Sequence, residues 1–152
     1  MLFALVLGVS VAAPASAGAA TGKPKADAGR FMVRVVTQVV ANDYDAAWTT
    51  LHPEHKRVAP RSTYVACELR NPVTGVLDKA RVLSVASRRF AMPGRARPIL
   101  GKAVRLQITL ADPETNETTR TTQTFHTVAV GSRWTWILPA RAYALYRSDS
   151  CF

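Results

Sequence analysis

The segment of residues 42–53 constrains the fold of this chain more than any other part of the sequence. It reads Asn-Asp-Tyr-Asp-Ala-Ala-Trp-Thr-Thr-Leu-His-Pro. Asn and Asp favour turns and caps because their short side chains bond nearby backbone groups, so Asp43 is predicted to cap a helix. A proline disfavours helical geometry in the residue before it, so this helix is predicted to end before Pro53. The apolar residues of its buried face recur at helical spacing and are Tyr44, Trp48 and Leu51.

Two further helices are predicted, one before and one after the segment of residues 42–53, which we call the joint. Residues 26–41 carry a continuous apolar face opposite a polar one, which predicts a long amphipathic helix. Residues 52–57 are predicted as a surface loop, and a third short helix is predicted to start with Pro60 in its first turn and to end near Leu69. The apolar face of the long helix consists of Ala28, Phe31, Met32, Val35, Val36, Val39 and Val40.

The second half of the chain has the two-residue period of β-strands. Residues 79–92, 104–110, 119–130 and 133–138 are predicted as four strands. The first of them does not keep one parity, which predicts a bulge. Gly131 and Ser132 predict a tight hairpin between the last two strands. Residues 140–147 are predicted as a short final helix that brings Cys151 to its partner.

Three helices followed by four antiparallel strands favour an α+β fold, with the three N-terminal helices packed on a curved four-stranded antiparallel sheet. The chain has 152 residues, which suits one domain. We assign that domain to residues 26–152, after a flexible lead-in at residues 18–25.

The N-terminal segment is predicted to be an export signal peptide. Residues 1–17 contain no charge, and residues 2–12 are apolar apart from Ser10. Ala-Pro-Ala and Ala-Ser-Ala follow, with the small side chains that signal peptidase accepts, although the basic n-region is missing. This apolar run is too short for a membrane span of about 20 residues. We therefore expect a secreted or cell-envelope protein whose mature chain has no membrane span.

The predicted export places the two cysteines in an oxidising compartment. Cys67 and Cys151 form an even pair, for which a disulfide is the default in an oxidising compartment. Two inert thiols remain an alternative. A reactive nucleophile is not favoured, because neither cysteine has a histidine beside it in the sequence.

Basic residues gather in the predicted hairpin of the first two strands. The formal net charge is +10, and residues 79–105 hold eight basic residues and no acidic one. A basic surface attracts polyanions, although Phe90 is the one aromatic residue available there for stacking on bases. A merely solvated basic hairpin is the alternative. The candidate anion-binding residues are Arg88, Arg89, Arg95, Arg97, Lys102 and Arg105.

These motifs resemble the nuclear transport factor 2-like (cystatin-like) superfamily. The motifs are Phe31 with the joint up to Trp48, the Leu-His-Pro stop and the closing Gly-Ser-Arg-Trp-Thr-Trp hairpin, and they cover residues 26–152. The export signal and the cysteine pair are similar to small secreted actinobacterial members. The resemblance implies a cone-shaped fold with a pocket that serves catalysis, binding or assembly.

The resemblance transfers no catalytic residue. Steroid isomerase-like members use a tyrosine inside the first helix and aspartates facing the pocket, whereas the inward face of residues 31–40 has no Tyr, Asp or His. His52, Glu54 and His55 do not have a recognised ligand spacing, so no metal or cofactor is expected. His126 faces either solvent or the pocket mouth. The pocket or core candidates are Phe31, Val35, Tyr44, Trp48, Tyr64, His126, Trp134 and Trp136.

The sequence therefore favours a secreted, non-catalytic binding or accessory domain. Its expected partners are a small apolar ligand in the pocket, or an anionic envelope polymer or partner protein at the basic hairpin. Homodimerisation through the sheet face is a further option. A pocket-based acid–base enzyme, isomerase or dehydratase-like, and a polyanion-binding protein remain alternatives.

Overall fold

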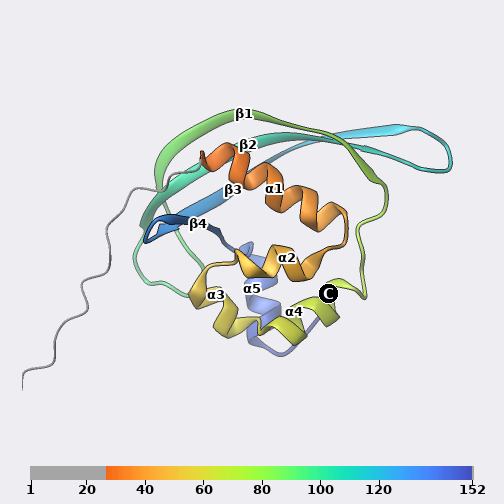
Figure 1. The fold of residues 1–152 in the computed structure, drawn as a ribbon. Coiled ribbons are helices and arrows are strands. Elements are labelled where there is room, and N and C mark those ends of the chain that lie inside the picture. The colour runs from red at the N-terminus through yellow and green to blue at the C-terminus, as the bar shows by residue number, and fades with distance from the viewer. Residues whose placement is uncertain (1–26, 152) are drawn as a thin grey trace, which may run out of the picture.

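The computed structural model describes residues 27–151, which form five helices and one four-stranded antiparallel sheet (Figure 1). The export signal (residues 1–17) and the lead-in (residues 18–25) predicted from the sequence lie outside the described residues. The helices are α1 (Ala28–Val40), α2 (Tyr44–Thr49), α3 (Pro53–Val58), α4 (Arg61–Glu68) and α5 (Ala140–Arg147). The strands are β1 (Val76–Phe90), β2 (Ile99–Ala111), β3 (Thr118–Val130) and β4 (Arg133–Trp136).

The predicted α+β class is confirmed, but the number of helices before the sheet is four and not three. The segment expected to be a surface loop forms α3. Its first residue is Pro53, whose missing N–H is not needed at that position. The imidazole Nδ1 of His52 accepts a hydrogen bond from the Glu54 backbone N–H at 3.3 Å and caps the helix. Pro53 therefore begins α3, whereas α2 has already ended at Thr49, and the intervening Leu51 and His52 pair with the Trp136 backbone.

The joint between α1 and α2 also fixes the start of the sheet. The Asp43 carboxylate accepts a hydrogen bond from the Ala46 N–H at 3.1 Å, which confirms the predicted cap. Asn42 adopts a φ of 56°, a left-handed conformation that Asn tolerates. Its Oδ1 accepts hydrogen bonds from the Tyr44 hydroxyl at 2.6 Å and from the Val73 N–H at 2.9 Å. The joint therefore holds the segment that leads into β1.

The sheet has the order β1-β2-β3-β4, and the five helices lie on one side of it (Figure 1). Two register shifts in β1 confirm the predicted bulge. In β2, Val104 and Leu106 are fully buried while Arg105 between them is exposed, which identifies the inner and outer faces. β4 pairs only with residues 127–130 of β3, so the earlier part of β3 forms a free edge.

Trp136 connects the last strand to the helices. It is 8% exposed, and its indole N–H donates a 2.8 Å hydrogen bond to the Ala47 carbonyl in α2. The backbone continues the link, because the His52 N–H donates to the Trp136 carbonyl at 2.8 Å. Burial of this aromatic ring with a satisfied N–H stabilises the contact between sheet and helices.

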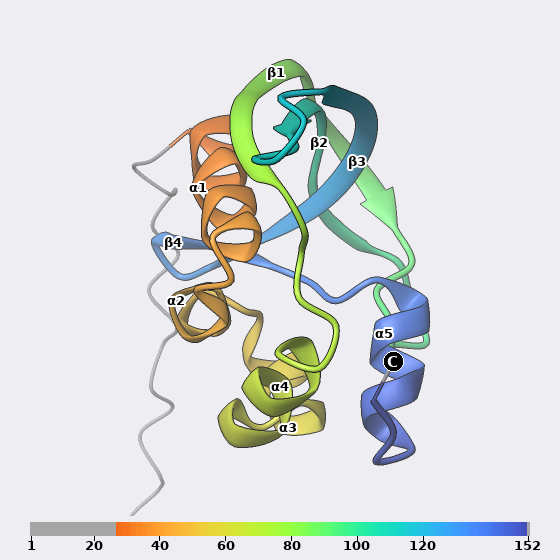
Figure 2. The same cartoon turned by 90° about the vertical axis from the view of Figure 1, so that its right-hand side faces the viewer.

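A disulfide joins Cys67 in α4 to Cys151 after α5, across a sequence separation of 84 residues, as the cysteine count predicted. Figure 2 shows α5 apart from α1, and its side chains pack on α3 and α4, where the Tyr143 ring lies 4.9 Å from the His55 ring and the Tyr146 ring 5.9 Å from the Tyr64 ring. The disulfide therefore ties the C-terminal helix back to α4.

Candidate functional site

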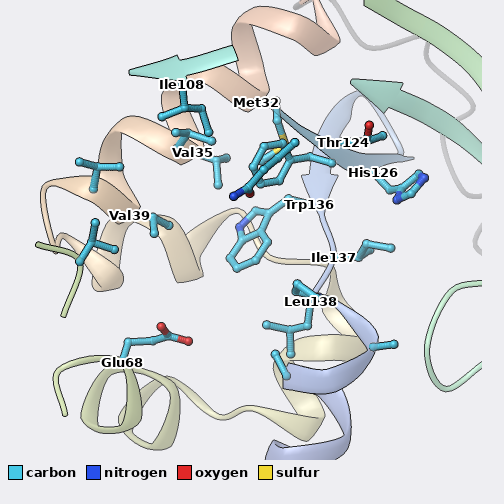
Figure 3. A pocket seen from close by; sticks show the side chains of 18 of the residues that line it. Met32, Val35, Val39, Glu68, Ile108, Thr124, His126, Trp136, Ile137 and Leu138 are labelled. Carbon is cyan, nitrogen blue, oxygen red and sulfur yellow. The ribbon is translucent and has the colours of Figure 1, made fainter. Parts of the chain in front are cut away.

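A cavity of about 650 Å³ lies between α1, the inner face of the sheet, α4 and α5 (Figure 3). Its size falls within the range of about 300 to 1,000 Å³ typical of small-molecule sites. It is lined by Met32, Val35, Val36, Val39, Val40, Tyr64, Glu68, Val73, Ala91, Pro93, Ile108, Leu110, Thr121, Gln123, Thr124, Phe125, His126, Trp136, Ile137, Leu138, Pro139, Ala140 and Ala142.

Most of the wall is apolar because three elements turn their hydrophobic faces to the same space. Val35 and Val39 come from one face of α1, four residues apart. Ile108 projects from the inner face of β2. Trp136 and Leu138 come from the end of β4 and the segment after it, and Figure 3 shows these side chains around the opening. Such a wall stabilises apolar groups of a ligand by removing them from water.

A carboxyl group stands at one end of this apolar space. Glu68, the last residue of α4, lines the cavity, and its Oε1 accepts a 2.8 Å hydrogen bond from the Tyr146 hydroxyl of α5. Burial raises the pKa of Glu68, and the hydrogen bond from Tyr146 opposes that rise. The carboxyl is therefore held in place by one partner and presents its other oxygen without a described partner.

Tyr64 lies one helical turn before Glu68 and also lines the cavity. Its side chain is 2% exposed, yet its hydroxyl makes no hydrogen bond to any residue from 27 to 151. Burial raises the pKa of Tyr64, and the neighbouring Glu68 raises it further. The hydroxyl stays protonated and is available as a donor to a molecule in the cavity.

At the opposite end, the free edge of β3 contributes Gln123, Thr124 and His126 to the lining. The register places Gln123 on the inner face, whereas Thr124 and His126 pair with Arg105 and Ala103 of the outer face and so lie at the rim of the cavity. The His126 ring packs on the Phe90 ring with 4.3 Å between centroids. Burial lowers the pKa of His126, so the neutral imidazole is favoured at neutral pH. The cavity is therefore apolar in its middle and polar at both ends.

The structure divides the pocket or core candidates between two places. Val35, Tyr64, His126 and Trp136 line the cavity. Phe31 and Tyr44 are buried in the core, and Trp48 and Trp134 pack against it partly buried. The Trp48 indole N–H donates to the Ala59 carbonyl at 2.8 Å, which is a structural role.

Sequence reasoning missed Glu68. Its signal was the i, i+4 spacing from Tyr64, which places the two side chains on one helical face. That face was known to be buried only once Tyr146 and the cavity were located. A single acidic residue at a helix end usually faces water, so the spacing alone did not identify it.

His52 and His55 are buried, at 5% and 0% exposure, and the prediction of a surface loop is wrong for both. The Nδ1 of His55 accepts a 2.9 Å hydrogen bond from the Leu138 N–H, and its Nε2 lies 3.2 Å from the Pro93 carbonyl oxygen. Burial lowers the pKa of His55 to about 4. His55 is therefore a neutral ring that connects α3, the loop after β1 and the segment after β4.

The candidate anion-binding residues do not share one surface environment. Arg95 forms a bidentate ion pair with Glu54, and the Lys102 ammonium donates to the Ser87 hydroxyl at 2.6 Å. Arg88 pairs with Gly101 and Arg105 with Ser84 in the register of the outer face. Arg89, one residue on from Arg88, points to the other side of the strand. Arg97 is exposed in the loop between β1 and β2.

Within residues 27–151 no cluster of three or more His, Cys, Asp or Glu side chains is arranged to hold a metal ion. No helix in this part of the chain is long and apolar enough to cross a membrane.

No family model, curated protein or solved structure matches this chain. The functional assignment therefore depends on the cavity and on the charges of the surface.

Proposed function

We propose that this protein is an exported, non-catalytic binding domain whose cavity takes a small apolar ligand. The observation that carries the proposal is the cavity of about 650 Å³, with its apolar middle and its few polar groups at the ends. This combination is typical of ligand sites, in which apolar walls supply affinity and a small number of polar groups fix orientation.

An acid–base enzyme is the second candidate for the same cavity. The observation that favours it is Glu68, a carboxyl whose pKa is raised by burial, as in many general acids. Against it stands the separation of the polar groups, because Glu68 and His126 occupy opposite ends in Figure 3. General acid–base pairs act on one reacting centre and therefore need to converge on it. Binding without chemistry is the better fit.

The test of the binding proposal uses N-phenyl-1-naphthylamine, an uncharged apolar dye that fluoresces when it leaves water. Val39→Trp fills the cavity from α1, and Val76→Trp adds the same side chain at a position that is 59% exposed and outside the cavity. We expect saturable dye binding to the native protein and to Val76→Trp, and its loss in Val39→Trp. Equal binding to all three proteins would place the dye elsewhere and contradict the proposal.

Export and family membership are parts of the same proposal. The Cys67–Cys151 disulfide supports an oxidising compartment, in which such bonds persist. Helices packed on one side of a curved antiparallel sheet, with a cavity between them, support membership of the nuclear transport factor 2-like superfamily. Mass analysis of the protein recovered from the medium of its host tests export. A mature chain that begins after residue 15 or 17 is the expected result.

A second function, polyanion binding, is favoured by the outer face of the sheet. The register places four exposed cations of this face in three successive rows, about 7 Å apart along the strands, and a fifth, Arg88, beyond the uncharged row of Ala86 and Ala103. Neither of the two ion pairs described within residues 27–151 involves any of them. They are Lys79, Arg81, Arg88, Arg105 and Arg120.

The test of polyanion binding uses polyphosphate at increasing salt. Replacing Arg81, Arg88 and Arg105 by Gln is expected to weaken binding and to flatten its salt dependence, because fewer counterions are released. The matched control replaces the exposed Arg30, Arg34 and Arg57 by Gln, which removes the same charge from α1 and α3. Equal weakening in both triple variants would mean that net charge alone attracts the polymer.

A further inference from the structure

The polar end of the cavity is assembled from α4 and α5. Tyr64 and Glu68 lie one turn apart on α4, and the Tyr146 ring of α5 stands 5.9 Å from the Tyr64 ring. The Tyr146 hydroxyl donates a hydrogen bond to Glu68 Oε1, which fixes the orientation of the carboxyl. The disulfide at Cys67 anchors the same turn of α4. Two groups remain, Tyr64 Oη–H and Glu68 Oε2, and their residues lie one helical turn apart on α4 and both line the cavity.

These two groups differ in their hydrogen-bonding capacity. The Tyr64 hydroxyl has no partner within residues 27–151 and stays protonated, so it offers a proton. Glu68 Oε2 makes no hydrogen bond to a described residue and offers lone pairs. A ligand that makes a hydrogen bond with each group gains more binding free energy than one that bonds to only one of them.

We propose, on the basis of the proposed function, that the cavity selects a neutral apolar alcohol whose hydroxyl accepts a hydrogen bond from the Tyr64 hydroxyl and donates one to the Glu68 carboxyl. A hydroxyl is a donor and an acceptor at once, which matches this pair. The hydrocarbon part of the alcohol extends along Val35, Val39 and Ile108 toward the β3 edge. Figure 3 shows Glu68 and these side chains around one continuous space.

Charged head groups fit this end less well. A carboxylate ligand would place a second negative charge beside Glu68, and like charges at short distance repel strongly in an apolar surrounding. An ammonium ligand would require an ionised Glu68 and the desolvation of both charges. The net charge of +10 also disfavours the approach of a cation. An uncharged hydroxyl avoids each of these costs.

The experiment measures the affinities of 1-octanol, octylamine and octanoate, which share one hydrocarbon chain, by displacement of N-phenyl-1-naphthylamine. We expect 1-octanol to bind tightest. Tyr64→Phe and Glu68→Gln are each expected to weaken 1-octanol about threefold to tenfold, the value of one lost hydrogen bond. The control variants Tyr143→Phe and Glu54→Gln, which make the same changes outside the cavity lining, are expected to leave its affinity unchanged.

The outcomes separate this inference from the proposed function. Equal affinities for the three octyl probes, or an unchanged 1-octanol affinity in both Tyr64→Phe and Glu68→Gln, would overturn the selection of an alcohol while leaving the apolar cavity as the binding site. A native protein that binds neither the dye nor any octyl probe would overturn both proposals. Retained dye binding in the two variants shows that their cavities are still folded.

Discussion

The Tyr146 hydroxyl donates a 2.8 Å hydrogen bond to Oε1 of Glu68 and so joins α5 to the end of α4. The disulfide from Cys67, the residue next to Glu68, makes a second and covalent connection between the same two parts of the chain. Both connections are made at the end of α4 that contributes Glu68 to the cavity. Two neighbouring residues of α4, Cys67 and Glu68, therefore connect α4 to the cavity wall that α5 forms.

Tyr146→Phe is expected to lower the free energy of unfolding by about 1 to 3 kcal/mol, because it leaves the partly buried Glu68 carboxyl without this partner. The loss should be larger at neutral pH than at pH 4, since the ionised carboxyl suffers more from desolvation. Urea denaturation at the two pH values measures it. Tyr143→Phe on the same helix, whose hydroxyl has no described hydrogen bond, is the matched control, and an equal loss there would contradict the assignment.

Glu68→Gln is expected to remove a pH dependence of stability. Burial raises the pKa of Glu68 in the folded protein, so the folded state holds this proton more tightly than the unfolded chain. The contribution of the group is complete below the unfolded pKa of 4.5 and is lost as pH rises through the folded pKa. The unfolding free energy of the native protein minus that of the variant should therefore fall as pH rises from 4 to 8. A constant difference would contradict the raised pKa of Glu68.

The His55 ring predicts the opposite pH dependence. Its pKa is lowered from 6.5 to about 4, mainly by burial, so the unfolded chain binds more protons between these values. Stability from this group is complete above pH 6.5 and falls as pH decreases toward 4, by at most about 3 kcal/mol. Denaturation of the native protein and of His55→Asn across this range measures the effect. A slope that persists unchanged in the variant would assign it to other groups.

Gly101→Ala is expected to destabilise the sheet by about 1 to 3 kcal/mol, as overpacking of a well-packed site does. A Cβ at this position would lie 2.4 Å from the Thr127 carbonyl oxygen and 2.8 Å from the Phe90 ring. Because the first neighbour is backbone, Phe90→Leu should not relieve the clash. Thermal unfolding of the single and double variants checks this, and full recovery in the double variant would show that the ring alone is responsible.

Local sequence patterns determined most of the secondary structure. Asp43 caps α2, and Val104 and Leu106 face inward, because capping and two-residue alternation act between near neighbours in the chain. The cysteine count gave the disulfide for a similar reason, since two cysteines allow one intramolecular pairing. The α3 helix was missed because Pro53 was interpreted only as the end of the preceding helix, whereas proline is also well suited to the first turn of a helix.

The tertiary structure decided what the cavity contains. Glu68 and Tyr146 are 78 residues apart, so no local pattern could pair them. His55 was read as a surface residue because its partners, Pro93 and Leu138, lie 38 and 83 residues away. The sequence by itself determined most of the helices and strands, α3 excepted, and that two cysteines would pair. Only the packing of α5 against α4 placed a carboxyl and an unpartnered tyrosine hydroxyl at the end of an apolar space, because burial depends on contacts between distant segments.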